Sequence, residues 1–137
     1  MKRSFYLDNI KTQSVNSMYT TTRFITSSYS EWLLRIKHKL DSEHDTAAIA
    51  ELKAFFDPKK HQIHVHIVAK YKNFYTKAKD ISSHTHDCSN FEKAILDIFC
   101  DRKHFDIAND KYVTRLLSEK QEAEQYDSFE VHMEILD

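Results

Sequence analysis

The chain has 137 residues, 41% of them apolar, which is enough for one hydrophobic core and is the usual size of a single domain. It contains no run of 18 apolar residues, and residues 1–20 carry charges without an apolar stretch. We therefore expect neither a membrane span nor a secretory signal, and a cytoplasmic protein. The net charge of −1 argues against a general nucleic-acid coat.

The charges are unevenly distributed along the sequence. Residues 1–79 contain 14 Lys and Arg against 7 Asp and Glu, a net of +7, whereas residues 80–137 contain 6 against 14, a net of −8. A basic half that contacts phosphates and an acidic half that binds a divalent cation would suit a metal-dependent nuclease. Two differently solvated faces would give the same distribution.

Hydrophobic periodicity predicts seven elements. Alternating polarity indicates strands, and apolar residues three and four apart indicate helices. In chain order, the predicted elements are a strand over 2–7, a helix over 28–40, a helix over 47–56, a strand over 61–70, a helix over 87–100, and strands over 111–120 and 128–136.

Local signals mark the ends of the first two helices. Ser28 and Glu31 form a capping-box pattern at the start of the first helix. Polar residues 41–45 separate it from the second helix, which ends before Pro58, the only proline.

The order strand, two helices, strand, helix, two strands favours an α/β or α+β domain over residues 1–137. We expect a mixed, mostly antiparallel sheet packed with two to three helices. In the third helix, Cys88 and Cys100 would lie about 18 Å apart along the axis, so we expect reduced thiols and no disulfide.

Polar side chains gather along one border of this third helix. At 100° per residue, four of them fall within an arc of about 120° beside the apolar stripe: Asp87, Asn90, Lys93 and Asp97. Magnesium takes hard oxygen ligands, usually one or two carboxylates with waters and substrate phosphates. Asp87 and Asp97 could supply part of that shell, and Asp110, at the entrance to the next strand, is a further candidate.

Such a pocket would suit a metal-assisted phosphodiester hydrolase, in which the cation polarises a phosphoryl oxygen and lowers the pKa of the attacking water. Lys93 could stabilise the charge that develops in the transition state. A solvated helix face with an N-cap aspartate is the alternative for the same residues.

Three segments of the sequence resemble one family. Residues 87–97, DCSNFEKAILD, look like the D-x-[DS]-N-x-x-K-x-x-x-D core of the RusA-type Holliday junction resolvases. Residues 109–113, NDKYV, resemble the acidic-pair motif D-D-x-x-V of that family. Residues 14–32, which begin with SVN, are similar to its opening P-S-x-N segment and its first helix.

The resemblance implies a magnesium-dependent endonuclease, with manganese as a possible substitute, that cuts branched DNA such as four-way junctions. It implies a homodimer, because a junction presents two symmetric scissile phosphates. It also implies that Asp87 and Asp110 bind the metal and that Lys93 is needed for cleavage.

Ser89, Asn90 and Asn109 are the supporting residues of this site. Ser89 stands where many members of the family have a second metal-binding aspartate, and Asn109 replaces the first acid of the late pair. Asp97, or a water held by Ser89, would fill the missing position. A DNA-binding or interaction protein that keeps the fold without cleaving DNA is the alternative function.

Residues 70–79 alternate lysines with Tyr71, Phe74 and Tyr75. This pattern is expected where phosphates are neutralised and unpaired bases stack on aromatic rings. An edge strand, with its aromatic rings in the core and its lysines opposing aggregation, is the alternative. The expected DNA contacts are Asn16, Arg23, Lys70, Lys72, Lys77, Lys79 and Lys120.

Nine histidines raise the alternative of a zinc site. His64 and His66 would share one face of a strand, near His61. No Cys-x-x-Cys pair supports this, and histidines on a solvated strand face are ordinary. His84 and His86 precede Asp87 closely, so they could touch DNA or tune the acidic pocket.

Overall fold

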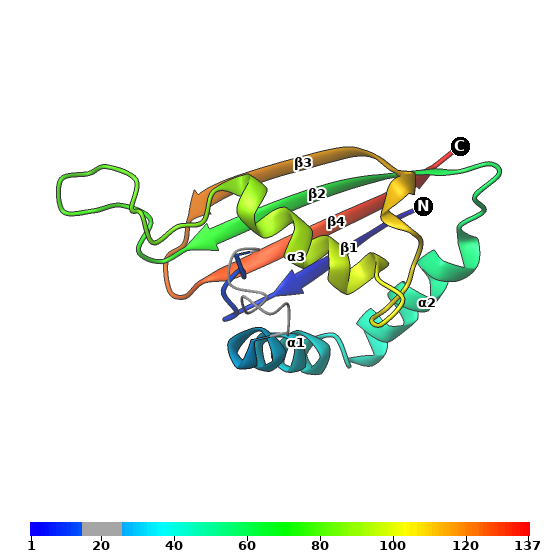
Figure 1. The fold of residues 1–137 in the computed structure, drawn as a ribbon, viewed down its shortest axis with the longest axis horizontal. Helices are drawn as coiled ribbons and strands as arrows, with labels where there is room; N and C mark the ends of the chain where they lie inside the picture. Colours follow the sequence, from blue (N-terminus) through cyan, green and yellow to red (C-terminus); the bar gives the residue numbers. More distant parts are fainter. Residues whose placement is uncertain (15–25) are drawn as a thin grey trace.

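Three helices and a four-stranded sheet make up the described part of the chain, residues 1–14 and 26–137 of a computed structural model (Figure 1). The elements are β1 (Lys2–Leu7), α1 (Ser27–Lys39), α2 (Glu43–Phe55), β2 (Gln62–Tyr71), α3 (Cys88–Cys100), the short 3-10 helix η2 (Asp110–Tyr112), β3 (Val113–Glu122) and β4 (Ser128–Leu136). They form one α+β domain, as the sequence predicts.

The strands lie in the order β1-β4-β2-β3. β4 pairs antiparallel with both β1 and β2, so that Val131 lies opposite Phe5 on one side and Ile67 on the other. β2 pairs with β3 in parallel, with Ile67 opposite Ser118. The predicted mixed, mostly antiparallel sheet is therefore confirmed, and its one parallel pair is joined by α3.

One face of the sheet carries the hydrophobic core. Every second residue of β2 and β4 is buried, beginning with Ile63 and Phe129, and the three helices pack on this face (Figure 1). Fully buried Phe99 of α3 meets Phe5 of β1 with their ring centroids 5.1 Å apart. Period-two burial of this kind is what alternating sequences produce when only one face is covered.

The other face of the sheet is open and mostly polar. His66 of β2 lies directly opposite His132 of β4, with their ring centroids 5.5 Å apart. His66 Nε2 lies 2.8 Å from Glu119 of β3, and His132 Nδ1 lies 2.7 Å from the Ser4 hydroxyl of β1. Side chains from all four strands thus contact one another across this face.

The helix starts differ from those expected. α1 is capped by Thr26, whose hydroxyl accepts a hydrogen bond from the Tyr29 N–H at 3.2 Å, so the predicted capping box at Ser28 is wrong by two residues. α2 starts four residues earlier than expected, because Ser42 caps it by accepting from Asp45 N–H at 3.1 Å. Side-chain caps inside polar runs decided both boundaries.

Both cysteines are free thiols, as expected, at the two ends of α3. Among residues 1–14 and 26–137, no helix is long and apolar enough to cross a membrane.

Replacing Phe99 by alanine should lower the free energy of unfolding by about 3–5 kcal/mol, because it leaves a cavity at the centre of the core. Urea denaturation measures this loss. Leu34→Ala is the control: the Leu34 side chain is 68% exposed, and its removal should change stability by less than about 0.5 kcal/mol. Equal effects of the two changes would contradict the assigned core.

Candidate functional site

The predicted metal ligands lie at opposite ends of α3. Asp87 is the N-cap residue of this helix, and Asp97 follows ten residues later, about 15 Å along the axis. Asp110 lies in η2, where the chain enters β3, near Asp97. The prediction that Asp87, Asp97 and Asp110 surround one cation is therefore wrong.

The parallel pairing of β2 with β3 explains this separation. A helix that connects two parallel strands runs back along the sheet, so its first turn lies near the ends of the strands and its last turn near their beginnings. Asp87 follows β2 and precedes α3, whereas Asp110 precedes β3. The two carboxylates are consequently held at opposite ends of the β2 and β3 strands.

Four predicted residues do gather in a hollow of about 390 Å³ at the last turns of α3, which we name the Asp110 hollow. Its lining residues are Lys93, Asp97, Cys100, Asp101, Arg102, Lys103, Asn109 and Asp110. Lys93 Nζ donates to Asp97 Oδ1 at 3.1 Å. The Asn109 side chain is engaged in capping η2, since its Oδ1 accepts from Lys111 N–H at 2.9 Å.

Three carboxylates line this hollow together with three cationic side chains, Lys93, Arg102 and Lys103, so the lining has no net formal charge. Partial burial raises the pKa of the Asp97 carboxyl, Lys93 opposes that rise, and the charges of Asp101 and Asp110 add to it. Burial, with the charges of Asp110 and Asp97 as further causes, raises the pKa of the Cys100 thiol to about 12. A divalent cation beside these carboxylates would relieve this repulsion.

The donor set fits magnesium. Asp97 and Asp110 offer the one or two carboxylates that Mg²⁺ usually takes, and phosphate oxygens and waters complete such a shell. Within the described ranges, no three His, Cys, Asp or Glu side chains are grouped to hold a metal ion. A cation in this hollow would therefore need ligands from water or substrate as well as from the protein.

A second group of predicted residues lies at the first turn of α3, in a hollow that we name the Asp87 hollow. It is lined by Ile81, Ser82, Ser83, Thr85, His86, Asp87, Asn90 and Lys120. The exposed Asp87 carboxylate makes no side-chain cap bond, and Lys120 Nζ donates to the Thr85 hydroxyl at 3.0 Å. Ser89 is exposed on the same turn.

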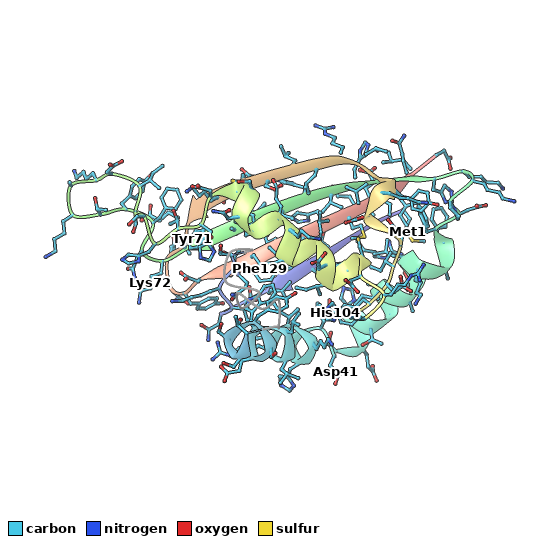
Figure 2. The ribbon with its side chains drawn as sticks, viewed as in Figure 1. Met1, Asp41, Tyr71, Lys72, His104 and Phe129 are labelled. Atoms are coloured by element: carbon cyan, nitrogen blue, oxygen red, sulfur yellow. The ribbon has the colours of Figure 1, made fainter. Side chains whose placement is uncertain are left out.

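The predicted DNA strip divides between surface and core. Lys72, Lys77 and Lys79 are exposed on the segment between β2 and α3, which projects beyond the end of the sheet (Figures 1 and 2). Lys70 instead lies on the open face, 3.4 Å from Glu130. Asn16 and Arg23 lie outside the described residues.

The aromatic part of that strip is largely interior. Tyr71 and Phe74 are 5% and 7% exposed, so the prediction that they stack on bases is wrong. Tyr75, 52% exposed, is the one aromatic ring of the three that solvent reaches. Tyr71 is the last residue of β2 and continues the period-two burial of that strand, which decides its direction.

A hydrogen-bonded group at this end of the sheet was missed. Thr12 Oγ1 lies 2.6 Å from Tyr71 Oη and 3.1 Å from His86 Nδ1, and His86 N–H donates to Tyr71 Oη at 3.3 Å. Burial lowers the pKa of the His86 imidazole, while the neighbouring Asp87 charge opposes this. Sequence periodicity cannot link residues that lie so far apart in the chain. The position of His86 directly before Asp87 was the only indication in the sequence that this histidine lies near a site.

Comparison with models of known protein families and with curated proteins finds no match to this chain.

Replacing Asp97 by asparagine should leave the melting temperature at pH 7 unchanged or raise it. A carboxyl whose pKa is raised on folding favours the protonated form, so its ionisation lowers stability as the pH rises through that pKa. Thermal denaturation at pH 7 and below pH 3.8 measures the effect, and any gain should vanish at the lower pH. A marked fall in melting temperature at pH 7 would mean that the Lys93 ion pair outweighs burial.

Proposed function

We propose that the protein is a magnesium-dependent endonuclease that resolves four-way junctions and related branched DNA in recombination and repair in the cytoplasm. The observation that carries this proposal is the Asp110 hollow, where Asp97 and Asp110 lie beside Lys93. Two carboxylates next to a lysine ammonium are the groups that metal-assisted phosphodiester hydrolysis requires. The resemblance of residues 87–97 and 109–113 to the resolvases supports the same reaction.

In this proposal, Asp97 and Asp110 would hold Mg²⁺, and the ion would supply polarisation of a phosphoryl oxygen and a lowered pKa of the attacking water. The Lys93 side chain is 60% exposed and ends at the hollow, so its ammonium can turn from Asp97 towards a phosphate oxygen and stabilise developing charge. Asp87, at the other end of α3, lies outside this metal shell.

The substrate contacts proposed are the exposed cations beyond the end of the sheet. Lys72, Lys77 and Lys79 are placed to neutralise phosphates, and Lys120 lines the Asp87 hollow close by. A homodimer would present one Asp110 hollow to each of the two symmetric strands of a junction. DNA contacts at both ends of α3 would set how a branched arm lies across the molecule.

The second candidate is a DNA-binding protein that does not cleave. The separation of Asp87 from Asp97 and Asp110 favours it, because the resemblance assigns Asp87 and Asp110 to one metal site. Serine at position 89 and asparagine at position 109 point in the same direction.

Incubating the purified protein with a synthetic four-way junction, with and without Mg²⁺, separates the two candidates. The proposal expects paired symmetric cuts that require the metal. Asp110→Asn and Lys93→Ala should each slow cutting by at least about 100-fold, because the first removes a metal ligand and the second removes a charge that stabilises the transition state.

Asp106→Asn is the matched control, since Asp106 follows α3 on the same side but lies outside the Asp110 hollow and contacts Lys53 instead. It should cut at the wild-type rate. Junction binding without cutting in Mg²⁺ or Mn²⁺ would establish the second candidate. A larger loss of cutting in Asp87→Asn than in Asp110→Asn would move the metal site to the first turn of α3.

A further inference from the structure

A large hollow lies outside the predicted site, at the end of the sheet from which the β2–α3 segment projects. Its volume is about 620 Å³, which is within the usual range for ligand sites. Residues 9–13, the first turns of α1 and the β3–β4 connection form its walls. We name it the Trp32 hollow after the only tryptophan of the chain, which lines it.

Two buried hydroxyl groups hold the His86 imidazole of this hollow in place. Thr12 and Tyr71, 4% and 5% exposed, place their hydroxyls against half-buried His86: Thr12 Oγ1 contacts Nδ1, and Tyr71 Oη accepts from the backbone N–H. Buried hydroxyls are costly unless they are hydrogen-bonded, and such a supporting layer holds a ring in one orientation. With Nδ1 engaged, Nε2 is the ring nitrogen left to meet a ligand.

His86 also lines the Asp87 hollow, so the two hollows adjoin at this residue. Lys120 and the first turn of α3 lie at the second of the two hollows that His86 lines.

The charges of the Trp32 hollow favour an anion. Lys11, Arg35 and Lys72 line it, against the carboxylates of Glu31 and Asp127. None of the three cationic side chains forms an ion pair with another residue of the described ranges. Asp127, by contrast, is engaged in structure, because its Oδ1 accepts from the Lys72 N–H at 2.7 Å.

The hollow also offers one accessible aromatic ring. Trp32 is 6% exposed, and its Nε1 donates to the Lys11 carbonyl at 2.6 Å, so the indole forms a wall and is not free to stack. Tyr126 on the β3–β4 connection is 40% exposed and can take a flat ring against its face. Cations and a stacking ring together are the groups that bind the phosphate and the base of one nucleotide.

We propose that the Trp32 hollow binds one nucleotide unit of an unpaired DNA strand. Lys11, Arg35 and Lys72 contact the phosphate, Tyr126 stacks on the base, and His86 Nε2 hydrogen-bonds to the phosphate or to the base edge. The inference rests on the proposed DNA-binding function, but it does not require cleavage. Paired bases cannot reach Tyr126 in this way, so the hollow gives the protein a preference for strands that leave the duplex.

Trp32 provides a direct measurement, because every change in intrinsic tryptophan fluorescence arises at the wall of this hollow. The protein is titrated with an eight-nucleotide oligothymidylate, with thymidine 5′-monophosphate and with a blunt hairpin duplex. The oligonucleotide should give a saturable change, with at least about tenfold weaker binding of the mononucleotide and the duplex. Equal affinity for the mononucleotide, or for the duplex, overturns the assignment to an unpaired strand.

Variants test the assigned contacts. Tyr126→Ala should weaken oligonucleotide binding at least about fivefold through lost stacking. Lys72→Ala should weaken binding and lower the slope of log affinity against log salt by about 0.7, the loss of one phosphate contact to a single strand. Tyr6→Ala on the open sheet face and Lys60→Ala in the α2–β2 connection are the matched controls, and both should bind as the wild type does.

Thr12 is a positioning residue in this scheme. Thr12→Val should weaken binding, and Thr12→Ser should restore it, because serine keeps the hydroxyl that holds His86. If Thr12 only supported the fold, Thr12→Val and Thr12→Ser would bind the oligonucleotide equally once both are shown to fold. Wild-type binding by Tyr126→Ala and Lys72→Ala, or the absence of any fluorescence change in the wild type, overturns the proposal.

The junction assay on the same proteins separates this inference from the proposed function. If the hollow is wrongly assigned, the wild type still cuts junctions in Mg²⁺ while the Trp32 signal stays silent. If cleavage is wrongly assigned, the oligonucleotide titration still responds and no cut appears.

Discussion

The parallel pairing of β2 with β3 is the constraint on which the rest of the molecule depends. Two parallel neighbours need a crossover, and α3 supplies it by running back along the covered face of the sheet. The apolar side of the helix, including Phe99, closes the core against β1. The polar border of the helix therefore runs along the sheet, from the lysine-bearing β2–α3 segment at one end to the Asp110 hollow at the other.

Much of the fold could be predicted from the sequence because burial follows a local period. The alternation in β4 gave its bounds and its buried side, and the spacing of apolar residues gave α3. Strand pairing is not local, and that is where prediction of the site failed. A helical wheel discards axial position, so it showed Asp87 and Asp97 sharing an arc without showing the distance between them. If the parallel pairing of β2 with β3 had been known, it would have predicted that Asp110 lies near Asp97 and far from Asp87.

The alternation of cations and aromatic rings in residues 70–79 predicted a DNA-binding strip, but this interpretation did not take into account where the strand ends. β2 extends through Tyr71, so the period of the strand points that ring inward, and its hydroxyl becomes part of the support beneath His86. Thr12 reaches the same place from the other end of the chain. Thr12, Tyr71 and His86 come together only through tertiary contacts, so no motif in the sequence indicates this group.

The strand order also leaves β3 as an outer strand with ten residues whose far side has no partner strand in the described chain. Long unpaired borders invite growth of the sheet by another chain. This one carries Arg115, Glu119, Lys120 and Glu122, whose charges would lose hydration against an incoming strand. Extension of the sheet by a further strand alongside β3 is thereby opposed.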